Sequence, residues 1–165
     1  TYTGGLSRYD RKSGKFHNYL EEFEKTGKGP GQIIYHVLFN DGWLYVSARN
    51  GLWKMNPDTN EFQILDNEKL FLTFEIDKRG YIWLTTGFEL YKIKVDGGKR
   101  LEVKQITERK AKITKIMEAS DGTIYISTLG NGVYVYNYDK EIKLIFIFWF
   151  DIVMQFFYIK KYTRL

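Results

Sequence analysis

Few residues in this sequence have the types and spacing that acid–base or metal chemistry requires. The two histidines, His17 and His36, fall on separate predicted strands, where a packing or edge role is expected. Carboxylates are scattered: glutamates group at 21–24, in a predicted loop, and aspartates recur beside glycine turns. Catalysis needs a nucleophile with a base, paired carboxylates or a metal cluster. The residues therefore predict no enzyme active site, no metal and no cofactor.

Two further features exclude other classes of function. The glycine-rich stretch GKGPGQ at 27–32 lacks the Lys-Ser/Thr ending and the following helix of a phosphate-binding loop, so we interpret it as a flexible connection. The net charge of +5 comes from 25 basic and 20 acidic residues spread along the chain. This pattern predicts solubility and no nucleic-acid partner. Without cysteine, a disulfide framework is excluded.

The elements that position these residues repeat along the chain. Gly42, Gly80 and Gly122 follow one another at intervals of 38 and 42 residues, and Asp41, Asp77 and Asp121 stand just before them. Such an aspartate is expected to bond its own backbone in the turn. Each unit has a strand before this turn (37–39, 74–76, 116–119), then a second strand (44–47, 82–85, 124–127), and then a third (52–55, 90–93, 133–136).

A fourth strand follows in each unit, as at 61–65 and 15–19. The beginning of the chain fits the same frame, because Gly5-Leu6 matches Gly51-Leu52 and Phe16 matches Phe62. Four antiparallel strands with a period near 40 are typical of a β-propeller blade. We name the strands A to D from the axis outwards. A β-solenoid is the alternative, but its rungs are usually shorter.

The sequence thus predicts an all-β fold, a partial β-propeller of about three and a half four-stranded blades with an apolar C-terminal tail. The expected units are 1–32 (partial blade and connection), 33–68, 69–108 and 109–140 (incomplete), followed by the tail at 141–165. Both faces of a blade pack on neighbouring blades, which explains aromatic strands without polar alternation. The prediction requires units stacked face to face and no continuous helix between Leu6 and Tyr138.

The repeated phrase resembles a known family. The pattern G-x-[IL]-[YW]-[IVL]-[ST], followed by G-[LV]-x-[KR]-[YM]-[ND], is similar to the two-component regulator propeller repeat over residues 1–140. That family forms the extracytoplasmic sensor region of hybrid two-component proteins of Bacteroidetes. The resemblance implies a non-catalytic, ligand-sensing module outside the cytoplasm that responds to carbohydrate-derived ligands.

The sequence also departs from the family pattern. Glu89 replaces the glycine that begins strand C of the third unit, the B–C loop at 129–132 has one extra residue, and the turn at 95–100 is irregular. About three and a half blades are too few to close a ring. The expected partners are therefore the missing blades or another copy of the chain, besides an oligosaccharide.

Alternating strand directions place the B–C and D–A loops together on one face of the blades. Sequence variation concentrates in these loops, as expected of a recognition surface on a repeated scaffold. Arginine and lysine there suit an acidic or sulfated sugar, and an exposed aromatic ring suits stacking on a sugar. The candidate ligand-binding residues are Arg49, Asn50, Phe88, Arg109, Lys110 and Asn131.

The C-terminal tail changes in character, since 142–159 reads IKLIFIFWFDIVMQFFYI. Eighteen residues approach the length of a membrane span, and Lys160 and Lys161 suit its cytoplasmic end. Asp151 near the middle opposes insertion. Three interpretations stay open: an outer blade strand, a membrane span that anchors the module, or the product of a disrupted reading frame.

Three classes of function follow from this sequence. The first is a ligand-sensing module of a membrane signalling protein. The second is a protein-interaction scaffold, because propellers of many families bind proteins. The third, a polysaccharide-cleaving propeller enzyme, lacks a convergent set of histidine, tyrosine and carboxylate.

Overall fold

The fold consists almost entirely of antiparallel strands. A computed structural model describes residues 3–96, 99–105, 112–138 and 140–145. Its elements, in chain order, are β1 (Ser7–Asp10), β2 (Lys15–Asn18), α1 (Leu20–Thr26), β3 (Ile34–Asn40), β4 (Trp43–Ala48), β5 (Gly51–Met55), β6 (Phe62–Asp66), β7 (Thr73–Ile76), β8 (Tyr81–Thr85), β9 (Leu90–Asp96), β10 (Lys99–Gln105), β11 (Lys112–Glu118), β12 (Ile124–Leu129), β13 (Val133–Asn137) and β14 (Lys140–Ile145).

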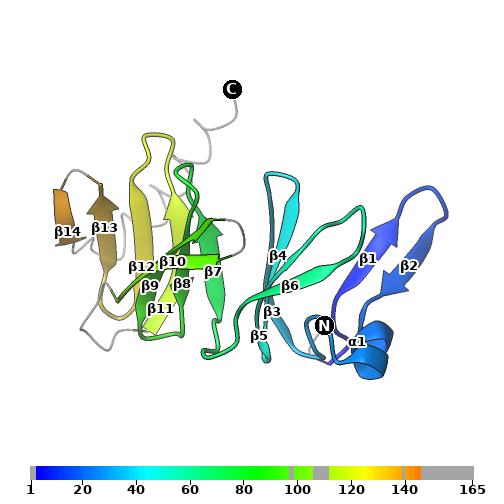
Figure 1. Ribbon diagram of the computed structural model, residues 1–165. Coiled ribbons are helices and arrows are strands. Elements are labelled where there is room, and N and C mark those ends of the chain that lie inside the picture. Colours follow the sequence, from blue (N-terminus) through cyan, green and yellow to red (C-terminus); the bar gives the residue numbers. More distant parts are fainter. Residues whose placement is uncertain (1–2, 97–98, 106–111, 139, 146–165) are drawn as a thin grey trace.

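These strands form one two-stranded and three four-stranded sheets. The orders are β1-β2, β3-β4-β5-β6, β7-β8-β9-β10 and β11-β12-β13-β14, each an antiparallel meander. We call these sheets blades 1 to 4. They follow one another side by side in Figure 1. The predicted all-β, partial β-propeller fold is confirmed, including strands A to C of every complete blade.

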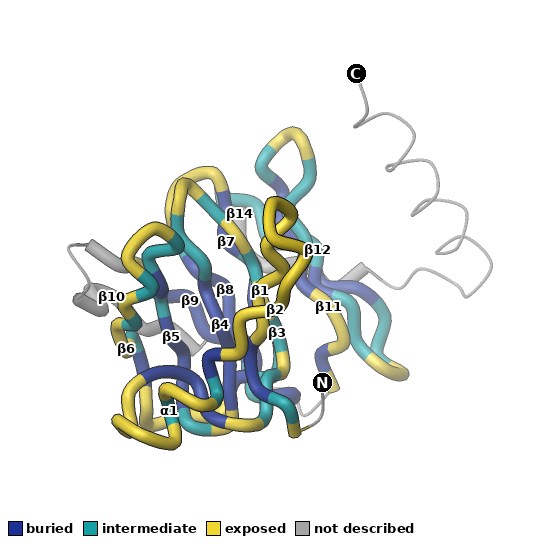
Figure 2. Tube along the Cα trace, turned by 90° about the vertical axis from the view of Figure 1, so that its right-hand side faces the viewer, coloured by how far each residue is buried: buried dark blue, intermediate teal, exposed yellow. Residues whose placement is uncertain are grey.

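Aromatic and branched side chains fill the spaces between successive blades, so the predicted face-to-face stacking is confirmed. Three buried clusters lie at the three interfaces, and Figure 2 shows the buried positions along the inner strands. Their fully buried members include Val46 between blades 1 and 2, Leu84 between blades 2 and 3, and Ile124 between blades 3 and 4. The core of this fold is therefore divided among interfaces, and each blade depends on its neighbours.

The short helix α1 contradicts the prediction that no helix interrupts the blades. It occupies the connection between β2 and β3 and includes the glutamates that were expected in a loop. The Asn18 Oδ1 atom accepts a hydrogen bond from the Leu20 N–H at 2.8 Å. At the other end, Gly27 has a φ of 68° and its N–H donates to the Phe23 carbonyl at 2.7 Å. Acidic residues in the first turn and a lysine in the last turn favour this helix. The seven-residue helix leaves the stacking of the sheets intact.

The end of blade 4 also lies differently from the expected boundary at residue 140. Strand β14 begins at Lys140 and pairs with β13, so blade 4 has four strands and extends into the predicted tail. A continuous apolar run has no alternation that marks where an outer strand begins, which explains the difference. The rest of the tail, 146–165, lies outside the described residues. Within the described ranges, no helix has the length and apolar character needed to cross a membrane.

The turn aspartates take two different roles. Asp77 Oδ1 accepts from the Arg79 and Tyr81 N–H groups, both at 2.9 Å, and Asp121 Oδ1 accepts from the Thr123 N–H at 2.9 Å. The predicted bonding to the local backbone is confirmed for these two. Asp41 instead adopts a φ of 47°, next to Gly42 at 77°, as a two-residue hairpin turn requires.

Gly51, at the beginning of strand C in blade 2, tolerates no side chain. Its φ is 131°, and a Cβ atom there would lie 2.5 Å from the Asp66 carbonyl oxygen on the neighbouring strand. We expect Gly51→Ala to lower the free energy of unfolding by about 2–3 kcal/mol, measured by urea denaturation. The matched control is Gly42→Ala, which has φ 77° and no atom within 4 Å of the added Cβ. Equal losses in the two variants would contradict the role of the close approach.

Candidate functional site

The loops that were predicted to form a recognition face lie together at one end of the row of blades. The β4–β5, β8–β9 and β12–β13 loops lie at the lower end in Figure 1, opposite the Asp-Gly turns. Four of the six candidate residues lie in these loops: Arg49, Asn50, Phe88 and Asn131. Arg109 and Lys110 fall outside the described residues. The amides of Asn50 and Asn131 bond to scaffold groups and to none of the other three candidates, so the described structure brings together their loops and not their side chains.

The side chain of Asn50 is part of the framework of blade 2. Its Oδ1 atom accepts from the Gly31 N–H at 3.0 Å and from Trp53 Nε1 at 3.3 Å. Its Nδ2 atom donates to the Gly29 carbonyl at 3.0 Å. These bonds hold the glycine-rich connection 27–32 against the B–C loop. The polar atoms that a ligand would need are therefore already engaged.

A similar hydrogen bond, between a B–C loop side chain and an aromatic residue of strand C, recurs in the other complete blades. Asn131 Nδ2 donates to the Tyr134 hydroxyl at 3.0 Å, three residues along the chain as in Asn50 and Trp53. In blade 3, Tyr91 stands at this position and its hydroxyl donates to Glu89 Oε2 at 2.5 Å. Glu89, which stands at the position of Gly51, thus supplies the acceptor that Asn50 supplies in blade 2.

Arg49 and Phe88 are the candidates whose side chains meet solvent. Arg49 is exposed, and only its backbone N–H bonds inward, to the Ile33 carbonyl at 3.0 Å. Phe88 is 54% exposed. Two further apolar side chains lie on the same loop end, Leu70 at 40% and Leu129 at 69% exposure. A cation beside exposed apolar rings and chains suits a ligand with both an apolar face and an acidic group.

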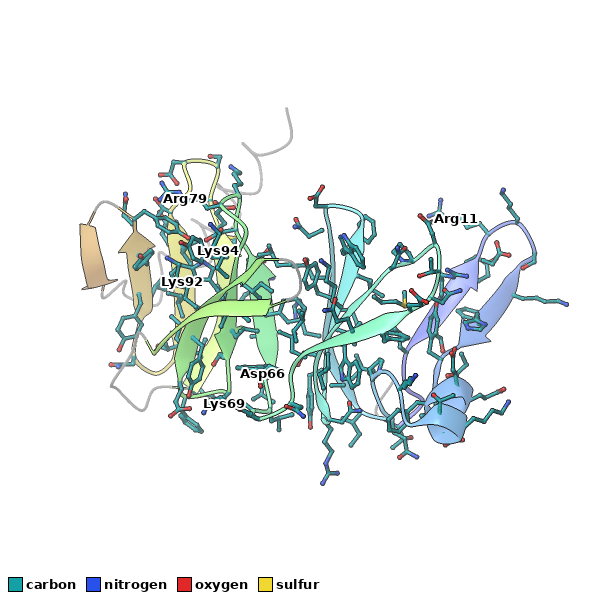
Figure 3. The ribbon with its side chains drawn as sticks, viewed as in Figure 1. Arg11, Asp66, Lys69, Arg79, Lys92 and Lys94 are labelled. Carbon is teal, nitrogen blue, oxygen red and sulfur yellow. The ribbon has the colours of Figure 1, made fainter. Side chains whose placement is uncertain are left out.

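A lysine–tyrosine contact at the loop end was missed by sequence reasoning. Lys69, in the D–A connection, places its Nζ atom 5.1 Å from the centre of the Tyr91 ring, at the lower edge of the molecule in Figure 3. A hydrogen bond with Tyr91 raises the pKa of Lys69, and burial raises the pKa of the Tyr91 hydroxyl. Both groups therefore keep their protons at neutral pH, and the Lys69 cation lies near the Glu89 carboxylate that accepts from the Tyr91 hydroxyl.

A cleft of about 490 Å³ lies between the C–D turn of blade 2 and the connection that joins blades 1 and 2. Amide, carboxylate and aromatic groups line it: Glu22, Lys28, Trp43, Asn56, Thr59, Asn60, Glu61, Phe62 and Gln63. Asn60 Oδ1 already accepts from the Tyr19 hydroxyl at 2.8 Å and from Arg8 Nη1 at 3.1 Å. The sequence analysis placed no candidate ligand-binding residue in this turn, whose residues are typical turn formers. The mixture of amides and aromatic rings could hold a polyhydroxylated molecule.

The two histidines lie on different blades and do not contact each other. His17 is exposed on β2, whereas His36 lies on β3 with its ring 4.9 Å from that of Phe74 and its Nδ1 3.0 Å from Thr73 Oγ1. Burial is the main cause that lowers the pKa of His36, and Lys115 lowers it further. His36 thus has the packing role that was predicted. Within the described ranges, no three His, Asp or Glu residues are grouped as a metal site would require.

Blades 3 and 4 are joined by an aromatic cluster around a buried cation. Lys92 is 7% exposed, and its Nζ atom lies 3.9 Å from the centre of the Tyr81 ring and 4.3 Å from that of Tyr138. Trp83 and Tyr136 complete the surroundings at 5.4 Å each. Figure 3 shows Lys92 between the strands, with Arg79 above it. The rings come from two blades, so this cluster stabilises the interface and offers no open site.

Comparisons with known proteins agree with this architecture. No family model and no curated protein matches the chain. The structure is similar to the extracellular domains of two proposed hybrid two-component systems of B. thetaiotaomicron. For BT4673 the TM-score is 0.70, with 22% identity over 91% of this chain and 21% of that one. For BT3049 the TM-score is 0.65, with 20% identity over 89% of this chain and 19% of that one.

An enzyme of the same fold is also similar. Virginiamycin B lyase from Staphylococcus aureus gives a TM-score of 0.55, with 17% identity over 69% of this chain and 41% of that one. At these identities the likeness shows the fold alone. The molecule is thus a row of β-propeller blades. It spans about a fifth of the length of the two extracellular domains that it resembles.

Proposed function

We propose that this chain is part of the extracytoplasmic ligand-sensing region of a hybrid two-component signalling protein. The observation that carries the proposal is the fold shared with the extracellular domains of BT4673 and BT3049. The repeated propeller phrase in the sequence supports the same class. In this role the blades bind a ligand without transforming it, and the signal passes to domains beyond this chain.

The ligand that we propose is an oligosaccharide, bound on the loop end of the blades. Arg49 supplies a cation for an acidic or sulfated sugar, and Phe88 supplies an exposed ring for stacking. Asn50 and Asn131 contribute by holding these loops in place, because their amides bond to the scaffold. The cleft at the C–D turn is the alternative location of the same function.

Calorimetric titration of the full chain with a neutral cellohexaose and a sulfated chondroitin hexasaccharide tests this proposal. We expect Arg49→Ala to weaken binding of the sulfated sugar by about tenfold, since it removes one charge-assisted contact. Phe88→Ala should weaken binding of both sugars. Arg11→Ala is the matched control, because this exposed arginine lies on the β1–β2 turn at the opposite end (Figure 3).

The titration also separates the two locations. Gln63 lines the cleft and lies on β6, outside the B–C and D–A loops. Weaker binding in Gln63→Ala together with unchanged binding in Arg49→Ala would move the site to the cleft. If neither sugar binds at millimolar concentration, the carbohydrate proposal is wrong.

A protein-interaction scaffold is the second candidate function. The loop end exposes Leu70, Phe88 and Leu129, three large apolar side chains from different loops. Exposed apolar groups on one surface are typical of protein-binding sites. In that case, the Leu129→Ser variant should lose a protein partner and retain any affinity for sugars.

A further inference from the structure

The innermost strand of blade 2 exposes a row of large apolar side chains. Tyr35, Val37 and Phe39 on β3 are 38%, 41% and 61% exposed. They alternate with residues that point to blade 3, such as Leu38, which packs on the core between blades 2 and 3. Because neighbouring residues of a strand point to opposite faces, the exposed row faces the side of blade 1.

The equivalent positions in the next blades are buried. Val37 pairs with Val46, as Phe74 pairs with Leu84 and Ile116 with Ile126, each partner standing four residues after the turn glycine. Phe74 is 1% exposed and Ile116 is 2% exposed, against 41% for Val37. Phe39 likewise corresponds to Ile76, which is 9% exposed.

What buries these positions is the inner pair of strands of the preceding blade. Strand β3 of blade 2 contacts β7, and β7 of blade 3 contacts β11. Blade 1 contains β1 and β2 within the described residues, and β1 corresponds to a C strand, as Gly5-Leu6 matches Gly51-Leu52. Strand β5 pairs with β4 and β6, whereas β1 pairs with β2 alone in the described part of the chain. One edge of β1 is therefore open beside the exposed row.

We propose that the open edge of β1 and the row Tyr35, Val37 and Phe39 form one docking surface for a two-stranded antiparallel hairpin, the inner half of a propeller blade. One strand of the hairpin would bond to the backbone of β1. Apolar residues at alternate positions of both strands would cover Val37 and Phe39, as β3 and β4 cover Phe74 and Ile76. The surface continues the interface between blades 1 and 2, where Leu6 and Tyr19 already pack on Val46 and Met55. This inference is independent of any ligand.

A fusion protein tests the docking surface. Residues 33–48, which are strands A and B of blade 2 with their turn, are joined ahead of Thr1 of the full chain. Residues 1–6 then connect the added strand B to β1, two residues more than the loop 86–89 of blade 3. We expect hydrogen exchange of the β1 amides to slow by about tenfold or more relative to the unfused chain.

Two comparisons decide the result. In a matched fusion whose chain carries Val37→Ser and Phe39→Ser, the slowing should be largely lost, whereas the exposed apolar control Phe88→Ser should retain it. Unchanged exchange of β1 in the fusion, or equal slowing in both fusions, would overturn the proposal. If exchange of β1 in the unfused chain slows as its concentration rises, and sedimentation shows a dimer, the occupant is a second copy and the hairpin proposal is wrong.

Discussion

Replacing Trp83 with alanine is expected to lower the free energy of unfolding by about 3–5 kcal/mol, the range for deletion of a fully buried large aromatic side chain. Trp83 has no exposed surface and lies between blades 3 and 4. Its ring packs edge-on against Tyr136 at 4.8 Å and Tyr138 at 6.4 Å. Since the interface consists of such rings, the cavity cannot close without moving a blade. Urea denaturation followed by circular dichroism measures the loss.

Trp43→Ala is the matched control for this experiment. Trp43 is only partly buried at the beginning of β4, with Lys54 Nζ 3.9 Å from its ring centre. The same chemical change there should cost less than half as much, because less apolar surface leaves contact with the protein. Should Trp83→Ala fail to fold, Trp83→Phe retains most of the ring and should lose about 1–3 kcal/mol. Equal losses at positions 43 and 83 would contradict the interface role of Trp83.

The regular part of the fold could be predicted from the sequence because turns and strands depend on residue types that are close together in the chain. Asp-Gly turns and runs of branched and aromatic residues place β4, β8 and β12 within one or two residues of the expected ranges. The repeat also predicted how the sheets are arranged, because three copies of the same sequence pattern imply similar sheets that stack on one another.

The helix α1 had a signal that the repeat frame concealed. Asn18, the glutamates of the first turn, Lys25 and Gly27 form an ordinary start and stop pattern for a helix. The D–A connections of a propeller are expected to be loops, and that expectation outweighed the local pattern. A stretch that differs from its counterparts in other repeats therefore has to be interpreted from its own residues.

The candidate site was predicted only in part, for a different reason. Loop variation correctly placed Arg49 and Phe88 on an exposed face, but it could not distinguish them from Asn50 and Asn131, which bond inward. Whether a loop amide faces solvent depends on the neighbouring connection, such as Gly29 and Gly31 for Asn50. Contacts between blades, including that of Lys92 with Tyr138, join residues of different repeats. The spacing of residues within one repeat therefore cannot predict them.

Asp77 shows most clearly how a turn aspartate can acquire a second task. Its Oδ1 atom accepts from N–H groups of the turn, as Asp121 Oδ1 does in blade 4. Its Oδ2 atom accepts from Trp83 Nε1 at 2.7 Å and from the Tyr138 hydroxyl of blade 4. Asp77 is 3% exposed. Burial is the first cause that raises the pKa of Tyr138, and the Asp77 carboxylate is the second. The tyrosine therefore keeps its proton, and remains a hydrogen-bond donor, well above neutral pH.

We expect Asp77→Ala to lower the free energy of unfolding by about 2–6 kcal/mol, because the Trp83 N–H and the Tyr138 hydroxyl lose their acceptor inside the interface and each costs about 1–3 kcal/mol. The matched control is Asp121→Ala, a turn aspartate of blade 4 that stands two residues after Ala119, the counterpart of Asp77. Asp121 is exposed and bonds Thr123 alone, so its loss should cost about 0.5–1.5 kcal/mol. Asp77→Asn retains one acceptor for the turn but places an amide where two donors converge, and should fall between the two. If Asp77→Ala and Asp121→Ala are equally mild, the carboxylate acts as a turn residue only, and packing of the rings alone joins blades 3 and 4.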